Sequence, residues 1–282
     1  MADAGYGVLV LLFVVSLYTF VTSILGGQRN SNTLIQSAQN GILMTAVFST
    51  IAIGLLSALL LRHDFSVSYV YQHTNLHLPV PYTLSALWAG QEGSLLLWFW
   101  FLALLSAVAL RKRRAARQDA GITGPYVLAT LASTQAFLAL VLLFTSNPFA
   151  RLALVPRDGQ GLNPLLQNFW MVIHPPIVFM GYAAYTVPFA LVVGGLITGR
   201  FSQEWLGAVR RWALFAWLFL GAGILMGAWW AYLELGWGGY WGWDPVENSS
   251  LIPWLTGTAL LHSLMMQEHR NTWRKWNVWL VA

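Results

Sequence analysis

The sequence predicts an all-α fold: a polytopic integral membrane helical bundle that carries an external tryptophan-rich loop. Of its 282 residues, 57% are hydrophobic and only 9% are charged, whereas soluble domains carry roughly a quarter charged residues. Apolar stretches of about 20 residues, the length that crosses a bilayer core, recur along the chain. Basic residues fall in short segments between these stretches, so the sequence pI of about 9.7 does not indicate a nucleic-acid partner. The absence of cysteine excludes disulfides and thiolate metal sites.

The apolar stretches predict seven full membrane spans and the start of an eighth at Trp276. Residues 1–228 would hold six transmembrane helices with their outer loops, residues 229–250 the external loop, and residues 251–282 helix seven with a truncated helix eight. No basic residue precedes the first span, so we interpret it as retained and not as a signal peptide. The seven predicted spans are residues 8–25, 41–61, 94–110, 126–144, 177–198, 212–231 and 251–266.

The distribution of basic residues predicts the orientation of the chain in the bilayer. Twelve of the fifteen lysine and arginine residues fall in alternate connections between spans. Since basic connections stay on the cytoplasmic side, these should face the cytoplasm. The N-terminus and the loops 62–93, 145–176 and 232–250 then lie outside. We interpret the basic cluster at residues 111–117 as a topology anchor.

The stretch 229–250, WWAYLELGWGGYWGWDPVENSS, is the most unusual part of the sequence. Its glycines allow tight bends, and its rings are spaced too irregularly for one helix face. We therefore predict a loop folded as a flat apolar platform that suits a large planar ligand. The rings of this platform are Trp237, Tyr240, Trp241 and Trp243. An interfacial aromatic belt is the alternative, and it accounts for Trp229 and Trp230 but not for the interleaved glycines.

The acidic end of this stretch predicts a helix start. Asp244, Pro245 and Glu247 fit the cap, first and third positions of a capping box. Capping explains both carboxylates, and Asp244 also stays among the candidate cofactor-binding residues because it closes the loop.

His262 is the sharpest candidate for chemistry inside the membrane. It lies eleven residues into the seventh span, ~16 Å deep at a rise of 1.5 Å per residue. A polar ring near mid-bilayer is costly and indicates function. We interpret it as an axial ligand of a buried haem, which histidine binds as the neutral imidazole. The alternative is a neutral histidine hydrogen-bonded to a neighbouring helix. No other histidine is predicted at this depth, so a bis-histidine site cannot be completed from this chain.

His174 is the candidate ligand on the outer side. The following prolines suit a helix start, so span five is predicted to begin just after His174. An outer haem could then use His174 as one ligand with the platform under its face, although a capping histidine is the alternative. Other outer histidines, which could supply a second ligand or be solvated loop residues, are His63, His73 and His77.

These motifs together resemble one family. WGGYWGWDPVENSS, preceded by His174-Pro175-Pro176 and followed by His262, closely resembles the CcmF family of system I cytochrome c maturation. That family belongs to a haem-handling superfamily marked by a tryptophan-rich WWD domain. The resemblance includes WAGQEGSLLLW and IHPPIVFMGY and runs along essentially the whole chain. CcmF proteins are considerably longer, so the chain is interpreted as an N-terminal portion.

The resemblance implies a cytochrome c-type biogenesis protein of the bacterial inner membrane, acting as a haem lyase (holocytochrome c synthase) subunit. The outer WWD domain would present haem from a CcmE-type chaperone. With a CcmH-type subunit, it would attach the haem vinyl groups to the CxxCH thiols of apocytochrome c. By position, His174 resembles the first outer ligand, and His262 resembles the first ligand of a haem b that reduces the incoming haem. The second ligands of both haems lie beyond the end of this chain. No catalytic residue is assigned, because the substrate brings the thiols.

Two other functions stay open from sequence. A haem exporter would need an inner-face site, for which His269 is the candidate, although no aromatic platform accompanies it. A passive assembly scaffold would need no haem.

Overall fold

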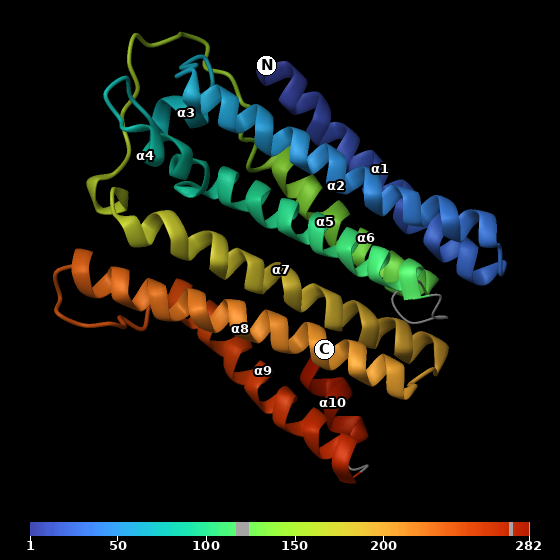
Figure 1. The fold of residues 1–282 in the computed structure, drawn as a ribbon. Helices are drawn as coiled ribbons and strands as arrows, with labels where there is room; N and C mark the ends of the chain where they lie inside the picture. The colour runs from blue at the N-terminus through green and yellow to red at the C-terminus, as the bar shows by residue number, and fades with distance from the viewer. Residues whose placement is uncertain (117–123, 271–272, 282) are drawn as a thin grey trace.

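The computed structural model describes residues 1–116, 124–270 and 273–281, which form ten α-helices and two short 3₁₀ helices (Figure 1). Arg117 of the predicted topology anchor lies outside the described residues. The α-helices are α1 Ala2–Gln28, α2 Asn32–Leu61, α3 Ser68–His73, α4 Val80–Ser85, α5 Gln91–Ala116, α6 Pro125–Phe144, α7 Phe169–Thr198, α8 Gln203–Glu234, α9 Pro245–Arg270 and α10 Arg274–Val281. The 3₁₀ helices are η1 Ala86–Trp88 and η2 Pro164–Leu166.

Six of the described helices are long and apolar enough to cross a membrane: α1, α2, α5, α6, α7 and α8. They contain the first six predicted spans. The seventh, residues 251–266, is helical within α9, but α9 is not among the six because threonines, serines and His262 dilute its leucines. The count of seven is therefore not confirmed, and the crossing of α9 stays a prediction. The predicted eighth helix corresponds to α10, which begins at Arg274 and not at Trp276.

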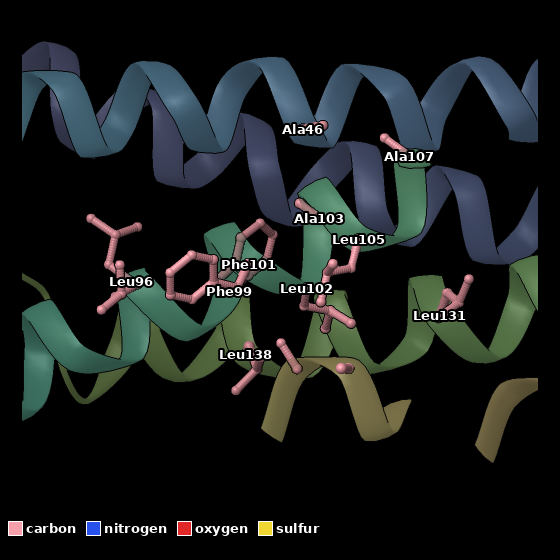
Figure 2. Close-up of a cluster of buried hydrophobic side chains, with 14 of the residues drawn as sticks. Ala46, Leu96, Phe99, Phe101, Leu102, Ala103, Leu105, Ala107, Leu131 and Leu138 are labelled. Atoms are coloured by element: carbon pink, nitrogen blue, oxygen red, sulfur yellow. The ribbon is translucent and has the colours of Figure 1, made fainter. Parts of the chain in front are cut away.

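Helices α1, α2, α5 and α6 form the N-terminal half of the bundle, and α5 lies at its centre. It packs against α2, α6 and α7, and 67% of its apolar window is buried, the largest share of the six spans. Leu96, Phe99 and Leu102 of α5 are fully buried (Figure 2). Helix α1 completes this half by packing on α2 and α6.

Helices α7 and α8 make the most extensive contact among the described helix pairs and join the N-terminal half to α9 and α10. Helix α7 also packs on α5 and α6, while α8 also packs on α9 (Figure 1). A Cβ added at Gly181 would lie 2.6 Å from the Leu220 nitrogen, and one at Gly223 would lie 2.8 Å from the Val178 nitrogen. The two backbones therefore touch, as small residues allow between membrane helices.

The two outer connections pair with each other. The Ser68 amide donates to the Ala150 carbonyl over 2.8 Å, and the Gln160 amide donates to the Tyr71 carbonyl over 2.7 Å. Asp158 adds a side-chain link, because its Oδ1 accepts from the Leu76 amide over 3.0 Å. The loops 62–93 and 145–168, both predicted to be outer, thus form one cap over one end of the helix bundle.

The Asp158 link predicts a pH dependence of this cap. Hydrogen bonding from the Leu76 amide lowers the pKa of Asp158 below its ordinary value of 3.8. The carboxylate therefore stabilises the folded loops above that ordinary value, and this contribution is lost as the pH falls through the lowered pKa. Amide hydrogen exchange, corrected for the intrinsic effect of pH, measures this contribution. The protection of the segment around Leu76 should fall as the pH drops through the lowered pKa of Asp158. Asp158→Ala should lack this step, and an unchanged step in that variant would contradict the link.

The α7–α8 contact predicts that one methyl group is costly at Gly223. Gly223→Ala forces a Cβ against the backbone of Val178, and such overpacking costs about 1–3 kcal/mol. Gly54→Ala is the matched control, because a Cβ at Gly54 in α2 meets nothing within 4 Å. Thermal unfolding in detergent should show a lower midpoint for Gly223→Ala and an unchanged or higher midpoint for Gly54→Ala. Equal midpoints would show that the helices do not touch at Gly223.

Candidate functional site

Helix α7 begins before His174, so the predicted start of span five is wrong. The Asn168 side chain caps the helix, its Oδ1 accepting from the Trp170 amide over 2.8 Å. Its amide nitrogen also donates to Glu234 Oε1 over 2.5 Å, which links the start of α7 to the end of α8. Since Asn168 supplies the cap, His174 lies in the second turn and is not a capping residue. Prolines 175 and 176 are inside the helix.

His174 faces a cavity of about 450 Å³ between α7, α8 and the start of α9. Three of the predicted site residues line it: His174, Trp241 and Asp244. Most of the remaining lining is apolar, including Val178, Phe179 and Ile224. The fold thus brings residues about seventy positions apart into one cavity, of the size and apolar character that ligand pockets have.

The His174 imidazole is held by packing and not by a hydrogen bond. Its ring stacks on Trp230, with centroids 6.0 Å apart and an interplanar angle of 24°. Gly227 of α8 lies beside it, and a Cβ there would come within 3.1 Å of Nδ1. Nδ1 is buried without a hydrogen-bond partner in the part of the chain that the structure describes. A buried polar atom left this way calls for an explanation, and ligand binding is one.

The tryptophan-rich loop is shorter than predicted. Of residues 229–250, positions up to Glu234 belong to α8 and positions from Pro245 belong to α9, so the loop is residues 235–244. The tight bends are confirmed at Gly236 and Gly238, whose φ values are +72° and +71°. Trp243 also has a positive φ of 57°, which is uncommon for a bulky residue.

The prediction of one flat platform is wrong, because the four rings do not share a plane. Trp241 and Trp243 meet edge-on at 82°. Tyr240 instead stacks on Tyr232 of α8, with centroids 4.5 Å apart and an angle of 10°. Trp237 donates to the Gly239 carbonyl over 2.7 Å. Only Trp241 lines the His174 cavity, and the other three rings are largely exposed.

The acidic helix start is confirmed, with a different partner for one carboxylate. The Glu247 amide donates to Asp244 Oδ1 over 2.7 Å, so Asp244 caps α9 as predicted. Glu247 Oε2 accepts from the Gly242 amide over 2.8 Å instead of reaching the cap residue. Since Trp241 precedes Gly242, this bond also fixes the point where the loop enters the cavity.

His262 lies elsewhere, on an exposed face of α9, and does not line the His174 cavity. Its Nδ1 pairs with the Thr258 carbonyl of the same helix over 2.8 Å, so the alternative of a bond to a neighbouring helix is not observed. Nε2 is therefore the nitrogen available to a ligand.

The outer histidines do not join His174. The His174 cavity is lined by none of His63, His73 and His77. The His73 Nδ1 pairs with the Tyr69 carbonyl over 2.9 Å. Over the described residues, no three histidine, aspartate or glutamate side chains converge in a way that could hold a metal ion. Of the four histidines predicted on the outer side, His174 alone lines this cavity.

Sequence reasoning missed two residues that shape the cavity, Gly227 and Trp230. Gly223 and Gly227 form a G-x-x-x-G pattern in an apolar helix. This pattern is a signal for close helix packing, and it could have identified Gly227. Trp230 had been assigned to an aromatic belt, and nothing in its local sequence shows that it stacks on a histidine of the preceding helix.

Comparison with known proteins finds relatives over almost the whole chain. A family model described as cytochrome c assembly protein matches residues 88–282. The chain is 42% identical over 281 residues to the cytochrome c-type biogenesis protein CcmF of Haemophilus influenzae, and 41% identical over 279 residues to that of Pseudomonas aeruginosa. A solved structure named cytochrome c heme lyase CcmF superposes with a TM-score of 0.85 at 34% identity.

The relatives are much longer than this chain. Each of these three matches covers 99% of the chain. The chain itself spans only 43% of the Haemophilus protein, 42% of the Pseudomonas protein and 44% of the solved structure.

Proposed function

Because the chain belongs to the cytochrome c assembly protein family, and is similar to CcmF proteins over nearly its whole length, we propose that it acts in attaching haem to apocytochrome c. The observation that carries this proposal is the cavity beside His174, where a histidine without a hydrogen-bonding role faces apolar walls and Trp241. In this function, haem at the outer site is a substrate.

The residues of the cavity fit that substrate. Haem is flat and apolar over most of its area, and the walls from Val178, Phe179 and Ile224 are apolar. The unpaired imidazole of His174 provides an axial ligand for the iron, which histidine commonly supplies. Trp241 supplies an aromatic surface at the loop end of the cavity.

The contribution of this chain is to hold the haem and to orient it for attachment. Each attachment adds a cysteine S–H across a vinyl C=C, so a C–S and a C–H bond form while the S–H and the π bond break. No electrons are gained or lost overall. The thiols come from the apocytochrome, so no side chain of this protein serves as nucleophile. Fixing the porphyrin edge beside the loop of residues 235–244 turns a two-body reaction into an oriented one.

We place a second haem, of b type, at His262. Its Nδ1 bonds the Thr258 carbonyl, which is how ligating histidines commonly fix the ring and leave Nε2 for the metal. When bound, this group would supply an electron to the iron of the outer haem. His262 is the one ligand of this group that we assign to the chain.

The cellular setting follows from the same proposal. The distribution of basic residues supports an orientation with the N-terminus and the tryptophan-rich loop on the periplasmic side of a bacterial cytoplasmic membrane. The partners would be a CcmE-type haem chaperone, a CcmH-type subunit and an apocytochrome with a CxxCH motif.

Optical spectra of the purified protein in detergent, loaded with haem, test the two sites separately. We expect His174→Ala to lose the signal of the outer haem, and His262→Ala to lose the b-type signal of the reduced-minus-oxidised spectrum. Each variant should keep the other signal, because the residues belong to different places in the fold. His77→Ala, an exposed loop histidine outside the cavity, is the control and should keep both. An unchanged spectrum in His174→Ala would remove the outer site, and binding of no haem by any form would leave only a scaffolding role.

A further inference from the structure

A tryptophan from a distant part of the chain donates a hydrogen bond to a backbone carbonyl near His174. Pro175 has no N–H, so the Met171 carbonyl, four residues before it, lacks the amide donor that a regular helix would provide at that position. The indole Nε1 of Trp88 donates to that carbonyl over 3.1 Å. Trp88 ends η1, with Ala89 and Gly90 between it and the start of α5, and so reaches α7 across the interface between the two halves of the molecule.

Trp88 is itself held rigidly. The Tyr69 hydroxyl lies 3.0 Å from the Leu87 carbonyl and accepts from the Gly90 amide over 3.1 Å. The Ser94 hydroxyl donates to the carbonyl of Trp88 over 3.0 Å. Tyr69 is buried, and its burial raises its pKa, so the phenol keeps its proton for this network. The indole therefore comes from a fixed turn and not from a flexible loop.

We propose that Trp88 is a positioning residue for His174, an inference that rests on the proposed function of the outer cavity. Met171 and His174 are three residues apart and lie on the same side of one helical turn. Without the indole, the Met171 carbonyl would stay unpaired in an apolar setting and would tilt to find a donor. The turn that carries His174 would shift with it, and the imidazole would leave its place between Trp230 and Gly227.

The sequence WAGQEGSLLLW provides a matched control in its second tryptophan. Trp98 lies on α5 and also packs against α7, with its ring centroid 6.3 Å from Phe179 and 5.7 Å from Tyr182. Its Nε1, however, has no hydrogen-bond partner among the residues described. Trp98→Phe therefore changes ring packing on α7, while Trp88→Phe removes the donor and keeps an aromatic ring.

The first readout is the rate at which diethyl pyrocarbonate modifies His174 in haem-free protein, followed by mass spectrometry. Trp88→Phe should raise this rate several-fold, and Trp98→Phe should change it by less than about twofold. The second readout is haem affinity, which should weaken about tenfold in Trp88→Phe, equivalent to about 1.4 kcal/mol.

A double-mutant cycle with Pro175→Ala separates hydrogen bonding from general damage. Alanine restores an N–H at position 175 that can pair with the Met171 carbonyl within the helix. In this background Trp88→Phe should change neither readout, because the carbonyl already has a donor. An equal effect of Trp88→Phe in both backgrounds, or no effect in either, would overturn the proposal.

The two readouts also keep this inference separate from the proposed function. If the wild-type protein binds no haem, the proposed function fails. The modification rate of His174 still decides whether Trp88 positions that residue, because it requires no haem.

Discussion

The close contact between the backbones of α7 and α8 is the constraint on which the rest of the structure depends. Gly181 and Gly223 allow the helices to touch, and Gly227, one turn further along α8, leaves room for the His174 ring. A larger residue at these positions would part the helices or displace the imidazole. Because α7 also packs on α5 and α8 also packs on α9, this pair sets the relation between the N-terminal half and the elements that close the cavity.

The site departs from regular helix geometry, and the departures are compensated from elsewhere in the chain. Apolar surroundings leave no water to pair a free backbone group, so a proline inside a membrane helix needs a donor from outside it. At Pro175 that donor is Trp88, which the outer cap holds through Tyr69. At the other wall, Asp244 and Glu247 pair the amides that begin α9 and fix the loop that carries Trp241. The outer segments therefore support the cavity and do not merely connect the spans.

Local signals in the sequence were sufficient for some features and not for others. Apolar length identified six spans, and capping chemistry identified the start of α9 at Asp244. His174 and the tryptophan-rich loop were predicted on the same side of the membrane, and His174, Trp241 and Asp244 line one cavity. The start of α7 was misplaced because Pro175 looked like a helix start, whereas Asn168 supplies the cap and a residue 83 positions away pairs the freed carbonyl. The ring planes of the tryptophan-rich loop depend on contacts such as Tyr232–Tyr240, which spacing alone does not reveal.

The proposed function depends above all on one contact, that of the His174 imidazole with haem in the cavity beside it, and chemical rescue tests this contact. His174→Gly removes the ring and enlarges the cavity, so imidazole added to the buffer can occupy its place. We expect this variant not to bind the outer haem, and we expect millimolar imidazole to restore binding with the spectrum of a histidine-ligated haem. If His174→Gly binds the outer haem without imidazole and with an unchanged spectrum, His174 is not the ligand.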